Sequence, residues 1–592
     1  MTRSMRCLRA RRSALRVRGS RRCGGLHQSV ATSLPGCSRE GKTMTVQNRV
    51  LAASGAGVMM LLAAVAAARN EASKGESAAI MAIQATSAGL LAAPAGAPRP
   101  RARVAGGQLS GVREGAVNAF LGIPYAAPPV GAQRWRPPGA APTWSGVRSA
   151  DHFAASCWQP VTPAGFGPWT HEYVVSGTVS EDCLYLNVWT AVTRGAHLPV
   201  MVWIHGGGFA SGSGSVPLYD GAALAARGII VVTINYRLGV FGFFAHPELT
   251  QEARVGGTPP GNYGLQDMIA ALRWVHANIT AFGGDPDAIT IAGQSAGAMS
   301  VHALIVSPLA KGLFRGAIAE SGLLTTLPLP ALADAERAGV ALGTSLHAAS
   351  LSALRSLPPE AFAGSGPAAP RSSPIADGDL LPATAAGTVL NDTPLLIGMN
   401  TDDPGSFGPP PVPSAQAVDK LLHDSYGALA GRFAPLYPAG TVAQQVVALR
   451  AIARDRGLAA LYAYSRARLA RSHQPLYVYL FDHVEPGPEA ARYRAFHSAE
   501  LAYVFDTLDA APERGFTAQD RELARIISGY WLAFVRGESP ASSRLPPWPR
   551  MRIEKPMIMH LGEPVEAQPL LPAPTLQAVR VFLAAGGVPR LF

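Results

Sequence analysis

The chain has 592 residues, of which 48% are hydrophobic and 15% charged, which indicates a packed globular protein long enough for one large α/β enzyme with insertions. Its net charge of +12 is concentrated at the N-terminus, where residues 1–43 hold eleven basic side chains and one acid. The remainder is nearly neutral, so charge gives no case for nucleic-acid binding, and we expect no nucleic-acid partner.

The N-terminal region has the composition of a targeting segment rather than of a fold. Residues 1–43 are predicted not to belong to the mature protein. From Met44 a short basic start leads into the 19-residue apolar run Val50–Ala68, which ends in small residues. This pattern predicts a signal peptide over residues 44–69, with a weak membrane anchor as the alternative. Residues 70–102 are expected to form an Ala/Pro-rich linker. We therefore expect a secreted or periplasmic protein without stable membrane insertion.

Residues 103–592 are predicted to form one α/β domain. Helical spacing over Leu265–Ile279 separates apolar runs of strand length, which indicates a mostly parallel sheet with helices on both faces. The segments Pro328–Pro374 and Pro409–Ser472 are expected to be helical excursions over the active site. The predicted strands are 119–125, 184–189, 200–204, 228–235, 288–292, 393–397 and 476–481.

The segment Gly293–Gly297 fits the nucleophile-elbow pattern G-x-S-x-G. A β-branched run precedes it and a helix-compatible run follows, as the strand–turn–helix context of the elbow requires. The turn exposes the hydroxyl of Ser295 and places the next backbone N–H where an oxyanion forms. Because a short pattern with three fixed positions also occurs by chance, the rest of the chain decides whether Ser295 is catalytic.

An acyl-transfer serine needs oxyanion donors, and a candidate loop follows the predicted strand 200–204. His205 is followed by Gly206, Gly207 and Gly208, and then by Phe209. Consecutive glycines permit backbone conformations that turn N–H groups toward one point, as in the H-G-G-G loops of esterases and lipases. A flexible glycine turn is the alternative interpretation.

The general base is expected late in the chain, because the order of the triad in this fold is Ser, acid, His. His497 follows the predicted strand 476–481 after a loop and is the best candidate. His473, His483 and His560 are its rivals.

The acid is expected just beyond a strand that lies between Ser295 and His497. The run 393–397 leads into two adjacent carboxylates, Asp402 and Asp403. The residues alone leave the choice open, since one can orient the imidazole while the other caps the turn.

Five cysteines are present, and two of them, Cys157 and Cys183, lie in the predicted domain. In an exported protein they can form a disulfide, and the alternative is two buried free thiols. The His and Cys spacing shows no metal motif, so no metal site is predicted.

Together, several blocks in order make the chain resemble the type-B carboxylesterase/cholinesterase family of α/β-hydrolases, over about Val104 to Trp548. Gly293–Gly297, His205–Phe209 and the stretch from His497 to Phe505 are among them. The others are 120–129, 180–188, 235–239, 261–265, 282–286 and 320–322.

The resemblance implies a role for each matching residue. Ser295 resembles the nucleophile, His497 the general base and then acid, and Asp403 the triad acid, where the family usually has Glu. Gly207, Gly208 and Ala296 resemble the oxyanion donors. Cys157 and Cys183 match an early disulfide of the family. No cofactor is implied.

The residue before the nucleophile refines the expected substrate class. Cholinesterases usually have Glu there, whereas this chain has Gln294, which weakens the case for a quaternary ammonium substrate. We therefore expect a serine carboxylesterase that acts on a small-molecule ester, and the chain resembles a bacterial general esterase more than an animal cholinesterase. The alternatives are a lipase, a carbamate or aryl-ester specialist on the same triad, and a catalytically dead adhesion or ligand-binding member.

Overall fold

The computed structural model describes residues 98–191, 195–324, 329–363, 372–382, 389–408, 411–540 and 545–591. The predictions for residues 1–43 and 44–69, and for most of the linker 70–102, lie outside the described residues. The first described strand begins at Arg101, two residues before the predicted start of the domain.

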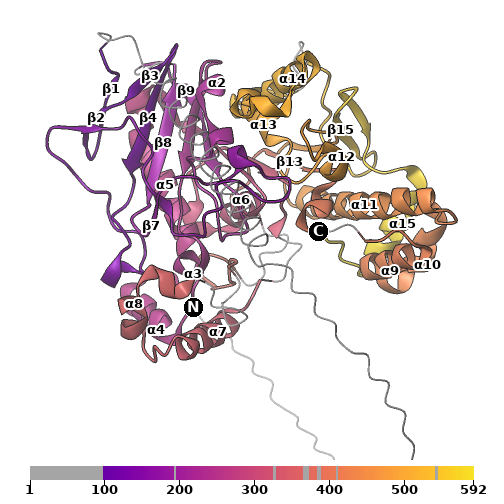
Figure 1. Cartoon of the computed structure of the whole chain (residues 1–592), viewed down its shortest axis with the longest axis horizontal. Helices are drawn as coiled ribbons and strands as arrows, with labels where there is room; N and C mark the ends of the chain where they lie inside the picture. Colours follow the sequence, from indigo (N-terminus) through magenta and orange to yellow (C-terminus); the bar gives the residue numbers. More distant parts are fainter. Residues whose placement is uncertain are drawn as a thin grey trace, which may run out of the picture. The chain divides into compact units, whose positions relative to one another are not determined.

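Eleven strands of the described chain form one sheet (Figure 1). Its centre, from β10 to β15, is parallel throughout, which confirms the predicted mostly parallel sheet. Antiparallel strands extend it at both edges. In spatial order the strands are β16 (Glu566–Pro569), β15 (Met557–Leu561), β14 (Leu476–Phe481), β13 (Leu395–Asn400), β12 (Gly316–Glu320), β11 (Gly284–Gln294), β9 (Leu198–Ile204), β10 (Ile230–Ile234), β8 (Tyr185–Thr190), β4 (Val117–Pro124) and β3 (Val112–Glu114).

The remaining strands lie outside this sheet. β1 (Arg101–Val104), β2 (Gly107–Ser110) and β5 (Val147–Ser149) form a three-stranded sheet, and β6 (Ser156–Cys157) pairs with β7 (Val179–Ser180).

The central strands are buried on both faces, and their side chains alternate between two hydrophobic cores. In β9, Val200, Val202 and Ile204 point into one core, whereas Met201 and Trp203 point into the other. This alternation follows from the two-residue period of a strand, and it explains why the sequence of β9 reads as a continuous apolar run.

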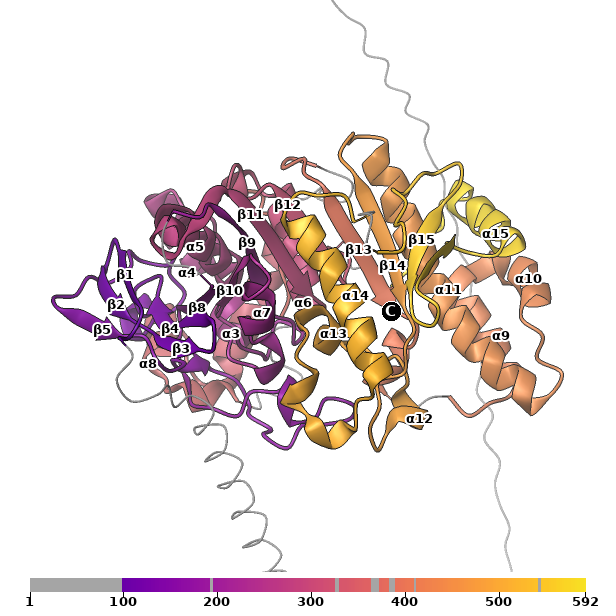
Figure 2. The ribbon, with the colours of Figure 1, turned by 90° about the horizontal axis from the view of Figure 1, so that it is seen from above.

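Helices cover both faces of the sheet. The core that holds Val202 also contains residues of α5, α6 and α11, and the opposite core contains residues of α13 and α14, which Figure 2 shows lying across the strands. The longer helices are α4 (Pro247–Gly256), α5 (Tyr263–Asn278), α6 (Ala296–Val306), α7 (Leu332–Ser345), α9 (Ala415–Tyr426), α11 (Val442–Leu469), α14 (Ala518–Val535) and α15 (Ala573–Ala584). The short ones are α2 (Ala222–Ala225), α3 (Gly239–Gly242), α8 (Leu351–Ser356), α10 (Ala430–Phe433), α12 (Ala490–Tyr493) and α13 (Leu501–Phe505).

The two predicted excursions are helical. The first contains α7 and α8, and the second contains α9, α10 and α11. Helix α11 begins with a capping box, in which Thr441 and Gln444 satisfy each other's backbone N–H groups, and it continues for 28 residues. Among the described residues, no helix combines the length and the apolar content that a bilayer crossing needs.

Candidate active site

The predicted site residues lie at the carboxyl ends of neighbouring parallel strands. Ser295 directly follows β11, and Asp403 lies three residues after the end of β13. His205 directly follows β9, and His497 lies on the loop that continues from β14. Because β9, β11, β12, β13 and β14 are adjacent, their ends form one edge of the sheet, where ligands bind in open α/β sheets.

The elbow holds Ser295 in a strained conformation with φ 56° and ψ −122°. The Ser295 N–H donates to the carbonyl of Glu320 at the end of β12 (2.8 Å), and the Ser295 carbonyl accepts from Met299 N–H in α6 (2.9 Å). Glycine is required at position 297, because a Cβ there would lie 2.0 Å from the Ile204 carbonyl oxygen. The close strand–helix crossing therefore enforces the sharp turn that presents the serine side chain.

The glycine loop after β9 lies against this elbow. A Cβ at Gly206 would lie 3.0 Å from the Ser295 Cβ. Gly207 has φ 101°, a conformation that glycine adopts readily, and its carbonyl closes the turn by accepting the N–H groups of Ala210 and Ser211 (both 3.0 Å). Ala296 is the first residue of α6, so its N–H has no acceptor within its own helix.

His497 is held on several sides and is 3% exposed. Its backbone N–H donates to Ser406 Oγ (2.8 Å), and its carbonyl accepts from Trp169 Nε1 (3.0 Å). The ring atom Nδ1 lies 2.8 Å from Asp403 Oδ1. A carboxylate only accepts hydrogen bonds, so the contact places a proton on Nδ1 and leaves Nε2 with its lone pair in the neutral imidazole.

The two adjacent aspartates have different partners. Asp403 is fully buried, and its second oxygen accepts the N–H of Asn400 (2.9 Å). Asp402 instead accepts from Arg450 Nε of α11 (2.9 Å) and lies 3.8 Å from Arg494. The geometry therefore places Asp403, and not Asp402, on the imidazole.

The rival histidines lie at other places in the fold. His483 pairs with Asp520 (2.8 Å), His560 pairs with Asp482 (2.6 Å), and His473 is exposed. The histidine of the glycine loop, His205, stacks on Tyr236, and burial lowers its pKa to about 4. It therefore stays neutral at ordinary pH.

Gln294 adds a contact that its position in the sequence did not indicate. Its side chain is buried, and its amide nitrogen lies 3.1 Å from His497 Nε2, the ring atom that faces away from Asp403. Since Nε2 carries the lone pair, the amide N–H is the donor.

Two further buried carboxyl groups lie near Ser295 and Asp403. Glu320 Oε1 accepts from Trp531 Nε1 (2.7 Å), and Glu500 Oε2 accepts from Asn400 Nδ2. Burial raises the pKa of Glu320 to about 8. Burial and the nearby acids Glu320 and Asp403 also raise the pKa of Glu500 well above its ordinary value. Both shifts favour the protonated, uncharged acid.

Aromatic side chains flank the imidazole. The rings of Phe407 and Trp169 lie 4.9 Å and 6.4 Å from that of His497, centroid to centroid. Phe166 packs 5.2 Å from Trp169, and both Phe166 and Phe407 are 59% exposed. Large exposed apolar side chains beside a reactive group are typical of a ligand-binding surface. Sequence reasoning missed these residues, although Phe407 lies only four positions after Asp403.

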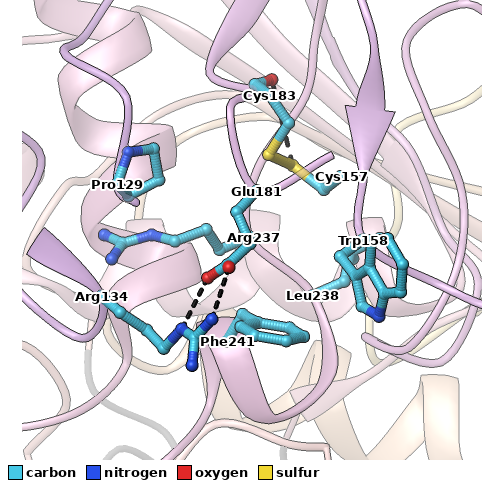
Figure 3. Close-up of a pocket in the computed structure, with 9 residues that line it drawn as sticks. All are labelled: Pro129, Arg134, Cys157, Trp158, Glu181, Cys183, Arg237, Leu238 and Phe241. Carbon is cyan, nitrogen blue, oxygen red and sulfur yellow. Dashed lines mark hydrogen bonds and ion pairs between the residues drawn. A yellow bond between two sulfur atoms is a disulfide. The ribbon is translucent and has the colours of Figure 1, made fainter. Parts of the chain in front are cut away.

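Cys157 and Cys183 form a disulfide, as the resemblance implied. A small pocket lies beneath it, and none of its lining residues belongs to the triad (Figure 3). Arg134 and Glu181 pair there through two hydrogen bonds of 2.7 and 2.6 Å.

In the described part of the chain, one group of side chains has the spacing of metal ligands. It consists of His171, Glu172 and Glu513, and it includes none of Ser295, His497 and Asp403.

The sequence profile of the carboxylesterase family matches residues 98–436 and 457–577. The chain belongs to the carboxylesterase family. It is 38% identical over 463 residues to fumonisin B1 esterase of Sphingopyxis macrogoltabida, a match that covers 75% of this chain and 83% of the relative. It is 36% identical over 466 residues to para-nitrobenzyl esterase of Bacillus subtilis (strain 168), covering 75% and 91%.

A solved PNB esterase structure superposes with a TM-score of 0.65 at 32% identity, and the match covers 81% of this chain and all of the other. The protein therefore has the α/β-hydrolase fold, and it is a carboxylic ester hydrolase of the carboxylesterase family.

Proposed function

We propose that the protein hydrolyses carboxylic esters through an acyl-enzyme on Ser295. The contact between His497 Nδ1 and Asp403 carries the proposal, because it leaves Nε2 unprotonated at the edge of the sheet where the elbow presents the serine. His497 takes the hydroxyl proton as Ser295 Oγ attacks the ester carbonyl. The oxyanion is bound by the N–H groups of Gly207, Gly208 and Ala296.

The acyl-enzyme forms when the tetrahedral intermediate collapses. The bond to the alkoxy oxygen breaks, and His497 gives its proton to the departing alcohol. Water then attacks the acyl carbonyl, transfers a proton to His497, and the second tetrahedral intermediate expels Ser295 Oγ, which recovers that proton. Asp403 stays ionised and holds the ring in one tautomer throughout.

Replacing the nucleophile tests this mechanism. The Ser295→Ala variant is expected to lower kcat for p-nitrophenyl butyrate by about 10⁴-fold or more, because attack on the carbonyl requires the hydroxyl oxygen. Ser498→Ala removes the hydroxyl of the residue next to His497, which accepts from Trp169 Nε1 (3.2 Å), and this matched control is expected to keep most of the activity. A Ser295→Ala variant that turns over at the rate of the unchanged enzyme would overturn the assignment.

The aromatic surface beside His497 supports a substrate with an apolar or aromatic group. Phe166, Trp169 and Phe407 form a series of neighbouring rings, with 5.8 Å between those of Trp169 and Phe407. An apolar ester group that packs on these rings would gain about 25 cal/mol of binding free energy for each Å² of apolar surface buried. Of the two relatives, fumonisin B1 esterase and para-nitrobenzyl esterase, the second is named after an ester whose alcohol part carries an aromatic ring. We infer a preference for bulky apolar esters over acetate esters of short alcohols.

A truncation at this surface tests the inferred preference. Phe407→Ala is expected to raise KM for benzyl butyrate about ten-fold while changing KM for methyl butyrate less, because only the benzyl group reaches the rings. Phe153→Ala removes an exposed ring that packs on Trp189 instead, and it serves as the control. Equal effects of Phe407→Ala on the two esters would contradict the preference.

We also propose that the protein acts outside the cytoplasm. The Cys157–Cys183 disulfide supports this, because structural disulfides persist in oxidising compartments, and the composition of residues 44–69 agrees. N-terminal sequencing of protein recovered from the periplasm or medium is expected to begin after residue 69. A mature protein found only in the cytoplasm would contradict the proposal.

A further inference from the structure

The side-chain amide of Gln294 lies between the imidazole of His497 and the glycine loop after β9. Gln294 is the last residue of β11, and its Cα is paired with that of Glu320. Its nitrogen contacts His497 Nε2 at 3.1 Å, and its oxygen is turned toward Gly206, where an added Cβ would lie 3.0 Å from it. The amide therefore presents its N–H, and not its oxygen, to the ring.

This orientation distinguishes the two charge states of the imidazole. The neutral ring offers a lone pair at Nε2, which accepts the amide N–H in the free enzyme and exchanges it for the Ser295 hydroxyl when the proton is transferred. A protonated ring would offer N–H at the same atom, and two donors would then face each other. The hydrogen bond thus stabilises the unprotonated base and is lost on protonation. A carboxylate at position 294 would do the opposite, because it accepts from the protonated ring and attracts its charge.

We propose that Gln294 is a positioning residue that keeps His497 unprotonated in the free enzyme and so extends ester hydrolysis to lower pH than a carboxylate at position 294 would allow. The inference rests on the proposed function, because it requires His497 to be the base.

The other groups around His497 do not provide this discrimination. Asp403 is on the far ring nitrogen, and Asp402 is paired with Arg450 and lies near Arg494. Burial raises the pKa of Glu320 to about 8 and that of Glu500 well above its ordinary value, so both shifts favour the uncharged acid where a histidine base loses activity. The acid limb of kcat/KM therefore reports the base itself in the free enzyme.

The test compares pH profiles of kcat/KM for p-nitrophenyl butyrate among variants at one position. Gln294→Met keeps the length of the side chain but has neither a donor nor a charge, and Gln294→Glu replaces the donor with an acceptor. The midpoint of the acid limb is expected to rise in the order Gln, Met, Glu, with the Glu variant about one pH unit or more above the unchanged enzyme. A merely structural role would lower rates without producing this order.

Two results would overturn the inference. One is an acid limb in Gln294→Glu at or below that of the unchanged enzyme, and the other is a limb in Gln294→Met that coincides with it. If either variant does not fold, Gln294→Asn withdraws the amide by one methylene, and its limb is expected to rise as in the Met variant. An unmoved limb in Gln294→Asn also overturns the inference.

Titration of the same preparations with a fluorophosphonate distinguishes a failure of the proposed function from a failure of the proposed role of Gln294. Unlabelled Ser295 in the unchanged enzyme means that the proposed function fails. Labelled Ser295 with unmoved acid limbs means that only the role of Gln294 fails.

Discussion

Among the clusters of buried or part-buried carboxyl groups in the described chain, two differ in their partners. Beneath the disulfide, Glu181 is held by Arg134, and Asp267 by two hydrogen bonds from Arg237 of 2.8 and 2.7 Å. At the triad, no arginine or lysine of the described residues forms an ion pair with Asp403, Glu320 or Glu500. Asp403 is paired with a histidine instead.

The difference separates structural acids from reactive ones. A carboxylate matched by arginine is held by charge-assisted hydrogen bonds that fix the position of two segments. Burial raises the pKa of Asp267, and the charge and hydrogen bonds of Arg237 oppose that rise. A buried acid without a cation either takes up a proton, as the raised pKa values of Glu320 and Glu500 indicate, or orients a group that titrates. The following variants test that distinction.

Asp403→Asn is expected to lower kcat for p-nitrophenyl butyrate by about 10⁴-fold, because the amide no longer fixes the proton of His497 on Nδ1. Asp402→Asn is the matched control, since it changes the adjacent residue, whose partner is Arg450. We expect less than a ten-fold loss for the control. Equal losses of kcat in the two variants would show that activity depends on the turn after β13 and not on the contact between Asp403 and the imidazole.

Arg237→Met is expected to lower the free energy of unfolding by about 3–5 kcal/mol, because it leaves the fully buried Asp267 without its cation. Arg521→Met breaks the exposed pair with Asp509 and is expected to cost about 1 kcal/mol or less. Urea unfolding measures both. Similar losses would contradict the view that the buried pair fixes the structure.

Replacing Cys157 and Cys183 together with serine is expected to lower the free energy of unfolding by about 3 kcal/mol, because the cross-link closes a loop between residues 26 positions apart. Reduction of the unchanged protein is expected to produce the same shift in the urea midpoint. An unchanged midpoint in both cases would show that the disulfide does not restrict the unfolded chain.

Glu320→Gln is expected to flatten the pH dependence of stability. The folded pKa of Glu320, about 8, lies above that of the unfolded chain, so the folded state holds the extra proton between roughly pH 4.5 and 8. Its contribution to stability is therefore complete below that window and is lost as the pH rises, with a slope of up to about 1.4 kcal/mol per pH unit. The change in stability is measured by thermal unfolding at about pH 5 and about pH 8, near the two ends of this window. A Gln variant with the slope of the unchanged protein would contradict the raised pKa.

The central strands were predictable from the sequence because burial on both faces makes them continuous apolar runs. β9 and β14 appear where they were expected. β12 (Gly316–Glu320) was missed, since its sequence Gly-Ala-Ile-Ala-Glu lacks the β-branched content of a strand, and its neighbours β11 and β13 determine its conformation. The short edge strands β3 and β16 were missed because tertiary pairing forms them.

The positions of Ser295 and the glycine loop could be predicted because local turn chemistry requires particular residues there. The choice between Asp402 and Asp403 could not be made from local residues, since both follow the same strand. The partner that engages Asp402 is Arg450, 48 positions later on α11. The contact of Gln294 with His497 spans 203 positions and likewise depends on the assembled fold.

Labelling with a fluorophosphonate, followed by peptide mapping, shows whether Ser295 is the nucleophile that His497 and Asp403 activate. We expect one phosphonyl group per chain, on Ser295, and much slower labelling in Asp403→Asn, because the reagent reacts with a serine whose hydroxyl proton is removed by an oriented histidine. Labelling at another residue, or equally fast labelling of Ser295 in Asp403→Asn, would contradict it.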